Sequence, residues 1–419
     1  MNVKTRPFVQ LTIYRSPFCL FLLAGCLLLL FHPSVAVSAQ LKDVLSLIGK
    51  KDALILEDDQ GNTLLSVHAD EKRIPASTLK IFTSLFALHY LGDTYRFPTE
   101  FYLDPENNLT VKGYGDPLLI SESLQEIARA LKTQTEFQHT VIQDIILDAT
   151  WFKQPVLIPG VKASGYDPYN APNGALCVNF NTVYFKKDKK TGHYITAEPQ
   201  TPLLPFVHER IKASPFSHER IVLSAENNEN TLYAGHLLKF FLEQEGIPCK
   251  GGIRPGTVDP AKDKLVYTYT STVPITEIIS KMLYFSNNFI ANQLLISAGA
   301  KINGPPGTLE KGLESARKYA RETLKIDDLS IVEGSGISRQ NQISATSMMT
   351  LLNKFAPHYL LLKHQGCEYF KTGTLTGIST RVGFILLPDG KKYAFVIIMN
   401  TKGQSAEKVV RKIKDILCR

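Results

Sequence analysis

The stretch Ala76–Gly92 reads ASTLKIFTSLFALHYLG. Its apolar residues recur at helical spacing and a glycine follows them, so it predicts a helix that is buried over most of its surface and is capped at Gly92. A lysine in such a helix needs a partner, and Lys80 follows Ser77 by one helical turn. This spacing puts the hydroxyl and the amine on one face, where the amine can take the proton of the hydroxyl. Ser77 is therefore the candidate nucleophile and Lys80 its candidate base.

The same Ser-x-x-Lys spacing occurs at two other places, Ser315–Lys318 and Ser405–Lys408. Ser315 lies in a charged segment that predicts a helix with a solvated polar face, and Ser405 stands at the N-cap position of the last predicted helix. Both are interpreted as structural. Only the copy at Ser77 lies in a context that favours chemistry.

A second candidate element is Ser286-Asn287-Asn288, between two apolar segments that predict helices. On its own it would be interpreted as a cap, with Ser286 or Asn288 bonded to the first turn of the following helix. The functional alternative gives Ser286 a place in proton transfer and gives Asn288 a hydrogen bond to a substrate amide.

Lys-Thr-Gly occurs twice. Lys190–Gly192 lies in FKKDKKTGHY, which predicts a solvated hairpin tip. Lys371–Thr374 follows an apolar approach and begins a strand-rich end of the chain, where a glycine inside a strand marks close approach by a ligand or another backbone. We expect the missing side chain of Gly373 to let a substrate pair with the strand edge, with Lys371 holding a carboxylate and Thr374 adding a hydroxyl and a backbone N–H.

The segments at the two ends of the sequence together predict one α+β domain. Residues 40–70 predict a short helix and a hairpin, and residues 381–418 predict a hairpin with a Pro-Asp-Gly turn and a terminal helix. Between them, residues 97–265 read mostly as short strands and turns, closed by one helix. The expected organisation is a catalytic domain from 40–96 and 266–419 with an inserted β-rich region at 97–265. The catalytic part also holds predicted helices at Ile275–Leu283, Phe289–Ala298 and Leu309–Leu324.

The first 39 residues predict a secretory signal peptide, with a basic start, an apolar run and small residues at Val37 and Ala39. Export to the periplasm or cell envelope is therefore expected. Two alternatives are a lipoprotein, because Leu23–Cys26 reads LAGC, and an uncleaved anchor. Removing this segment lowers the formal net charge from +8 to +5, a mild positive balance that suits a polyanionic wall or membrane surface.

Composition excludes some other classes. No long Lys/Arg tract with interleaved aromatics points to nucleic acid, and no CxxC or HxxxH spacing points to a metal. The histidines are scattered without a partner pattern. Outside the predicted signal peptide the cysteines are Cys177, Cys249, Cys367 and Cys418, which allow three disulfide pairings and leave the choice open.

Ser-x-x-Lys, Ser-x-Asn and Lys-Thr-Gly in this order are the signature of serine β-lactamases and penicillin-binding proteins. Here 209 residues separate Ser77 from Ser286, and 85 separate Ser286 from Lys371. The chain resembles the class C low-molecular-mass penicillin-binding proteins, the D-alanyl-D-alanine carboxypeptidase/endopeptidase family, whose inserted region explains the long first separation. The other blocks that carry this resemblance are Arg73–Tyr102, Gly113–Leu119 (GYGDPLL), Tyr169–Val183 (YNAPNGALCVNFNTV) and Glu333–Ala345 (EGSGISRQNQISA).

The resemblance implies a transpeptidase-like, serine β-lactamase-like fold with an antiparallel sheet flanked by helices. It also implies acyl transfer from D-alanyl-D-alanine ends of peptidoglycan stem peptides, or from D-alanyl cross-links, with penicillin as an inhibitor and no cofactor. The implied catalytic residues are Ser77, Lys80 and Ser286. The implied substrate-binding residues are Asn288, Lys371, Thr372, Gly373 and Thr374, and the implied oxyanion hole is the backbone N–H of Ser77 and of Thr374.

Two positions depart from the family pattern: Asn170 stands where a glycine is usual, and Glu333 where an aspartate is usual. Two rival functions are also open. A serine β-lactamase would share the first half of the mechanism, but the Glu-x-x-Leu-Asn loop and the Tyr-x-Asn motif of such enzymes are not visible. A non-catalytic wall-binding or penicillin-sensing protein could use the same fold, although the complete trio of motifs argues against it.

Overall fold

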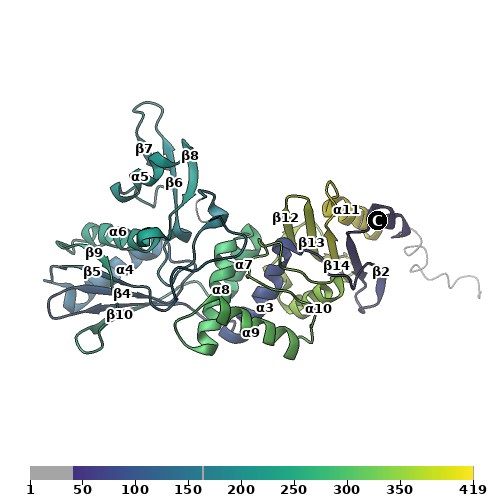
Figure 1. Ribbon diagram of the computed structural model, residues 1–419, viewed down its shortest axis with the longest axis horizontal. Coiled ribbons are helices and arrows are strands. Elements are labelled where there is room, and N and C mark those ends of the chain that lie inside the picture. Colours follow the sequence, from purple (N-terminus) through teal and green to yellow (C-terminus); the bar gives the residue numbers. More distant parts are fainter. Residues whose placement is uncertain (1–40, 163–164, 419) are drawn as a thin grey trace, which may run out of the picture.

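The computed structural model describes residues 41–162 and 165–418. The predicted signal peptide, the lipoprotein-like LAGC box and the alternative anchor lie outside these residues. Among the described helices, none has the length and apolar character needed to cross a bilayer. The described part of the molecule is elongated, with its first and last segments together in one half and the inserted region forming the other (Figure 1).

A six-stranded antiparallel sheet organises the half that holds the first and last described segments. Its order is β11-β12-β13-β14-β1-β2, so β1 from the beginning pairs with β14 from the end, with Ala53 opposite Ile398. The strands are β1 (Ala53–Glu57), β2 (Thr63–Val67), β11 (Lys363–Gln365), β12 (Glu368–Leu375), β13 (Ile378–Leu386) and β14 (Lys392–Met399).

The two faces of this sheet are covered by different helices, because side chains alternate along a strand. Leu54 and Phe395 pack in the cluster formed with α11 (Ala406–Leu417) and the 3-10 helix η1 (Lys42–Leu47). Ile55 and Val396 point the other way, into the main core. On that side lie α3 (Lys80–Leu91) and α10 (Ala345–Phe355). The 3-10 helix η2 (Ala76–Leu79) leads directly into α3, and the 3-10 helix η8 (Ala356–Leu361) directly follows α10.

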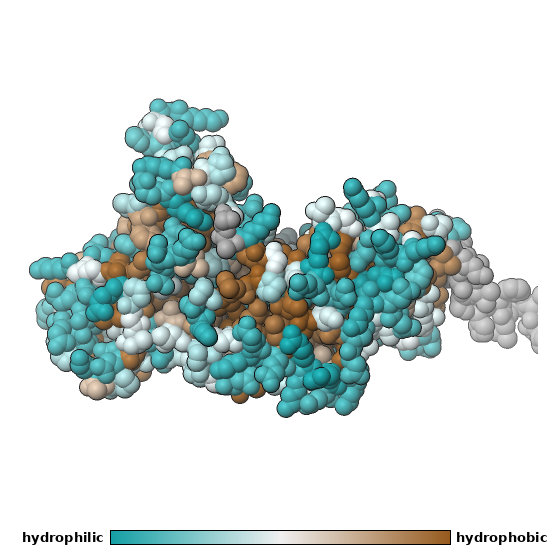
Figure 2. Space-filling model, in the orientation of Figure 1, coloured by the Kyte–Doolittle hydropathy of each residue, from teal (hydrophilic) through white to brown (hydrophobic). Residues whose placement is uncertain are grey.

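The helix α8 (Asn288–Asn303) is the centre of the helical layer, since all of its residues from Phe289 to Ala300 are buried. It packs against α3 and against α9 (Leu309–Glu322). At the crossing of α8 and α9, a Cβ on Gly299 would lie 2.6 Å from the Cα of Gly312, so only glycine allows this approach. The helix α7 (Ile275–Phe285) precedes α8. Figure 2 shows hydrophobic residues gathered over the middle of the visible face, where α3, α7 and α8 lie.

The inserted region enters and leaves by neighbouring strands, because β3 (Pro98–Leu103) pairs with β10 (Lys264–Thr270). The structure therefore carries this region to Thr270, past the expected boundary at 265. A five-stranded sheet, β10-β3-β4-β5-β9, packs against two helices, and a smaller sheet, β7-β6-β8, forms the arm seen in Figure 1. The remaining elements are β4 (Leu109–Gly113), α4 (Ser121–Thr133), η3 (Thr135–Phe137), β5 (Ile145–Asp148), η4 (Pro168–Asn170), η5 (Asn179–Asn181), β6 (Thr182–Lys187), β7 (Tyr194–Thr196), η6 (Pro205–Val207), α5 (His208–Ala213), β8 (His218–Val222), η7 (Glu226–Asn228), α6 (Glu229–Gln244) and β9 (Ile253–Pro255).

Three of the described α-helices, α4, α10 and the short α5, were not predicted from the sequence. The helix α4 buries Leu124, Ile127, Ala128 and Leu131, a spacing that indicates an amphipathic helix and was overlooked among the strand-like segments around it. The helix α10 was also missed. In the opposite direction, the helix expected near residue 41 is only the short η1.

Candidate active site

The candidate residues meet where η2, the junction of α7 and α8, β12 and the loop 333–338 come together. Ser77 lies in η2 and is half-buried, so its hydroxyl can be reached from solvent. Lys80 begins α3 and is fully buried. The sequence predicted one helix through both residues, whereas the structure has a tight 3-10 turn first, with Ala76 in the left-handed region at φ 48°.

Two glycines hold this turn in place. A Cβ on Gly336 would lie 1.9 Å from the carbonyl oxygen of Ala76, and a Cβ on Gly373 would lie 2.8 Å from the backbone nitrogen of Ser77. The Thr380 hydroxyl, on β13, donates to the carbonyl oxygen of Pro75 at 2.8 Å. The loop 333–338 and the β12–β13 pair therefore pack against the turn that carries Ser77 from two directions.

The position of Gly373 gives its missing side chain a different purpose from the one expected. The sequence interpretation gave that space to a substrate, but the structure fills it with the hydroxyl of Thr380 and with the backbone of Pro75 and Ser77. The backbone that approaches Gly373 closely is that of the turn carrying Ser77.

We predict that Gly373→Ala will slow acylation of Ser77 strongly, by about 100-fold or more, because a displacement of the order of 1 Å at a reacting atom costs that much. The measurement is the rate of benzylpenicillin acylation, together with the thermal midpoint of unfolding. Gly192→Ala, in the other Lys-Thr-Gly copy, is the control: its Cβ would meet nothing within 4 Å, although its φ of 72° will cost some local stability. A Gly373→Ala protein that acylates at the wild-type rate would contradict this role.

The Lys80 amine has three oxygen neighbours. Its Nζ lies 3.0 Å from Ser77 Oγ, 2.8 Å from Asn288 Oδ1 and 2.7 Å from the carbonyl oxygen of Ser335. Burial and the nearby charge of Lys371 hold the pKa of Lys80 well below its usual range, and the carboxylate of Glu333 opposes this shift. A neutral amine has two N–H groups, which donate hydrogen bonds to Asn288 Oδ1 and to the carbonyl oxygen of Ser335. Its lone pair then faces the hydroxyl of Ser77.

Glu333 builds the loop that reaches Lys80. Its buried carboxylate accepts hydrogen bonds from the backbone N–H of Ser335 and Gly336 and from Asn341 Nδ2, at 2.6, 2.7 and 2.6 Å. These bonds curl residues 333–338 into a turn that aims the Ser335 carbonyl at Lys80. The sequence marked Glu333 only as a departure from the family, and neither Glu333 nor Ser335 was among the predicted site residues.

Ser286 and Lys371 form a second pair. Ser286 ends α7 in the left-handed conformation, at φ 55°, and its Oγ accepts a hydrogen bond from Lys371 Nζ at 2.8 Å. Lys371 is 2 % exposed. Burial and the charge of Lys363 lower the pKa of Lys371 to about 7.

The helix after Ser286 is capped by neither of the residues considered. The side chain of Asn287 accepts from the backbone N–H of Ile290 at 3.0 Å. Asn288 is then free to turn its Oδ1 to Lys80, where the structure places it. The structure thus brings Ser77 and Asn288 each into direct contact with Lys80.

The strand β12 offers an open edge beside Ser77. Its first residues, Glu368–Phe370, pair with β11, but within the described residues the edge from Lys371 to Leu375 has a partner only on the β13 side. Thr372 and Thr374 are exposed along this part, while Lys371 and Gly373 point inward. An extended peptide could pair with this edge as an added strand.

The other copies of the motifs lie elsewhere. Lys190 and Thr191 stand in an exposed turn where their backbone N–H groups bond Asp188. Ser315 accepts a hydrogen bond from Asn303 on the packed side of α9. Ser405 precedes α11 without a side-chain cap bond. The structure therefore gives none of them the surroundings of Ser77.

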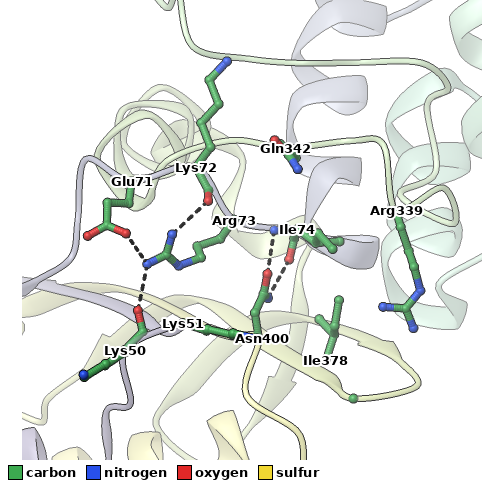
Figure 3. A pocket seen from close by; sticks show the side chains of 11 residues that line it. Lys50, Lys51, Glu71, Lys72, Arg73, Ile74, Arg339, Gln342, Ile378 and Asn400 are labelled. Atoms are coloured by element: carbon green, nitrogen blue, oxygen red, sulfur yellow. Dashed lines mark hydrogen bonds and ion pairs between the residues drawn. The ribbon is translucent and has the colours of Figure 1, made fainter.

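A basic cavity of about 380 Å³ lies beyond the β12–β13 turn (Figure 3). Lys50, Lys72, Arg73 and Arg339 contribute to its lining, and none of its lining residues is a predicted site residue. Figure 3 shows Asn400 bonded to Ile74, whose N–H and C=O it holds at 2.8 and 3.1 Å. This contact fixes the segment just before the turn that carries Ser77.

Comparison with known proteins agrees with this geometry. A family model described as the D-Ala-D-Ala carboxypeptidase 3 (S13) family matches residues 34–232, 209–366 and 360–418. The chain is 26 % identical to a D-alanyl-D-alanine carboxypeptidase of an Actinomadura species, over 83 % of this chain and 77 % of the relative. It is 23 % identical to the D-alanyl-D-alanine carboxypeptidase DacB of Haemophilus influenzae, over 83 % of this chain and 82 % of that protein.

Among solved structures, penicillin-binding protein 4 from Haemophilus influenzae matches with a TM-score of 0.69 at 19 % identity, covering 90 % of this chain and 98 % of the other. A peptidoglycan endopeptidase from Bdellovibrio bacteriovorus matches with a TM-score of 0.50 at 16 % identity, covering 87 % of this chain and 90 % of the other. These likenesses confirm the expected penicillin-binding, β-lactamase-like fold.

Proposed function

Because the chain belongs to the D-Ala-D-Ala carboxypeptidase 3 (S13) family, we propose that it is a serine D,D-peptidase that cleaves D-alanyl bonds of peptidoglycan stem peptides through an acyl-enzyme on Ser77. The observation that carries this assignment is the contact of the buried Lys80 amine with Ser77 Oγ. A nucleophile within hydrogen-bond reach of a base that is itself oriented by further groups supports covalent acyl transfer.

Acylation begins when Lys80 takes the proton of Ser77 and the Oγ attacks the carbonyl carbon of the D-alanyl bond. The backbone N–H groups of Ser77 and Thr374 stabilise the oxyanion that forms. Asn288 keeps Lys80 oriented through its Oδ1 and binds the acyl side of the substrate. The substrate lies along the open edge of β12.

The leaving amine takes a proton through Ser286, which lies beside Lys371. Lys371, Thr372 and Thr374 hold the carboxylate next to the scissile bond, and Gly373 shapes the strand beside them. Water then attacks the ester on Ser77 and releases the acyl product, with Lys80 as the base for this second step.

The choice between two substrates tests this function directly. The protein is incubated with an uncross-linked pentapeptide and with a cross-linked peptide dimer, and products are identified by mass spectrometry. Release of D-alanine indicates a carboxypeptidase, and release of monomers from the dimer indicates an endopeptidase. Cleavage of neither substrate would leave a non-catalytic binding protein on this fold.

The place of action follows from the substrate. We propose that the protein works outside the cytoplasm, in the periplasm or cell envelope, where peptidoglycan lies, and that the basic residues favour peripheral contact with an anionic membrane or wall. Cell fractionation with an antibody to the chain tests this. Recovery only in the cytoplasmic fraction would contradict it.

The lowered pKa of Lys371 predicts a pH dependence. In the free enzyme the positive charge of Lys371 is lost as the pH rises through about 7, so binding of a carboxylate-ended substrate weakens above that pH. We expect kcat/KM for the pentapeptide to fall on the alkaline side, while kcat falls less, because a bound carboxylate keeps the proton on Lys371. Parallel pH profiles of the two constants check this. Lys190→Ala, in the exposed copy, should leave both profiles unchanged.

A further inference from the structure

Three large apolar side chains are exposed beside the candidate active site. Phe285 is 72 % exposed, Tyr284 is 55 % exposed and Leu360, from η8, is 67 % exposed. Phe285 directly precedes Ser286, and α7 contacts both η8 and β11. Single exposed apolar residues are ordinary, but a group of them at the rim of a catalytic cleft indicates a binding surface.

These residues lie on the side where the leaving group departs. With the oxyanion at Thr374 and the leaving amine at Ser286, the acyl part of a substrate lies toward Leu375 and the leaving part lies toward Lys371. A peptide that follows the β12 edge in this direction meets β11, which already pairs with Glu368–Phe370. A leaving part longer than one residue must therefore rise out of the sheet beside β11, next to the end of α7.

The positive charge of Lys363, on the leaving-group side of the cleft, complements the carboxylates of a stem peptide. Lys363, at the start of β11, is exposed, and its Nζ lies 5.4 Å from the centre of the Tyr284 ring. The positive charge of Lys363 also helps to lower the pKa of Lys371. Stem peptides carry free carboxylates, so a lysine beside an aromatic pair offers both an ionic partner and an apolar surface.

We propose that Tyr284, Phe285 and Leu360, with Lys363, form a docking shelf for the departing half of a cross-linked stem peptide, so that the enzyme favours cross-linked substrates over single pentapeptides. This inference rests on the proposed D,D-peptidase function and adds no new chemical step. The departing group is the side-chain amine of a second peptide in place of free D-alanine, and it takes its proton through the same Ser286.

The test compares three reactions in the wild-type chain and in a Tyr284→Ala/Phe285→Ala variant. They are cleavage of a cross-linked peptide dimer, cleavage of the pentapeptide and acylation by benzylpenicillin. We expect kcat/KM for the dimer to fall about tenfold or more, as for loss of an aromatic anchor, while the other two rates change less than about twofold on the same scale. Leu265→Ala, at a 47 % exposed site on the edge strand β10, is the matched control and should change none of them.

Other outcomes overturn the shelf. An equal loss in all three reactions would mean that the variant disturbs Ser286, and an unchanged rate on the dimer would mean that the aromatic pair contacts no substrate. Wild-type protein that forms no penicillin adduct would instead overturn the proposed function. A single Phe285→Leu variant, which keeps apolar area, should retain more dimer cleavage than the double variant.

A separate observation concerns the cysteines, whose pairing the sequence left open. Cys367, just before β12, and Cys418, just after α11, have Sγ atoms 3.3 Å apart, while Cys177 and Cys249 are buried at separate places. We infer that Cys367 and Cys418 are a disulfide site that ties α11 to the strand carrying Lys371. In this reaction the two thiols lose two protons and two electrons, and a small-molecule or protein disulfide is reduced to two thiols.

Peptide mapping after exposure of the native protein to oxidised glutathione tests this pairing. We expect one linked peptide pair containing Cys367 and Cys418, lost on reduction and absent from a Cys418→Ser variant. Recovery of both residues as free thiols or as separate glutathione adducts would contradict the site. Cys177 and Cys249 serve as internal references that should stay unmodified until the protein is unfolded.

Discussion

A Ser77→Ala chain is expected to gain no mass from benzylpenicillin, whereas the wild-type chain gains one molecule and keeps it for hours. The substitution removes only the hydroxyl group, and the alanine adds no bulk to the tight turn that Gly336 and Gly373 enclose. Because the acyl-enzyme cannot form without Oγ, peptide cleavage should fall by about 10⁵-fold or more. Intact-mass spectrometry over time and a D-alanine release assay measure the two effects.

The chain supplies its own control for this experiment. Ser405 has the same Ser-x-x-Lys spacing, but its side chain makes no cap bond to α11, so Ser405→Ala should leave adduct formation unchanged. A persistent adduct on Ser77→Ala would place the nucleophile elsewhere. An adduct that forms on wild-type protein and clears within seconds would favour a β-lactamase, and no adduct on wild-type protein would leave a binding protein.

The contacts of the site could be predicted from the sequence only in part. Ser77, Lys80, Ser286 and Lys371 were found because fixed spacings and local context mark them, and the structure brings them together from η2, α3, the end of α7 and β12. The contribution of Ser335 could not be found this way, since it acts through a backbone carbonyl that any residue has. Glu333 lies far from Lys80 in sequence and acts only by shaping that turn, so its role depends on the fold.

The fold, like the site, could be predicted from the sequence only in part. Apolar runs on either side of turn residues predicted the strands at both ends of the sequence, and the structure pairs β1 with β14, both of which are buried on both faces. The left-handed conformation of Ala76 had no local signal, because alanine has no preference for it. It exists because the loop 333–338 and β12 approach from both sides, which is tertiary packing that overrides local propensity.

Replacing Lys80 by methionine is expected to slow acylation of Ser77 by about 10³-fold or more, near the upper range for loss of a general base. Methionine has a similar length and suits a fully buried position, so the change removes the amine with little loss of volume. It also leaves Asn288 Oδ1 and the Ser335 carbonyl without the donor that they share, and we therefore expect a lower thermal midpoint as well. Stopped-flow penicillin acylation and thermal unfolding measure the two effects separately.

A Lys80→Arg variant separates the base from the charge. Arginine keeps a positive charge near Ser77 but does not lose its proton in the working pH range. If Lys80 acts as a base, Lys80→Arg should be as slow as Lys80→Met even in protein that remains folded. If Lys80 serves only to orient Ser77 by its charge, the arginine variant should recover much of the rate. Lys318→Met, at a position where the side chain is 65 % exposed, controls for loss of a lysine from the same motif and should acylate at the wild-type rate. In the wild-type chain the first-order acylation rate at saturating penicillin should rise with pH and level off below the usual lysine range, because burial and Lys371 favour the neutral amine.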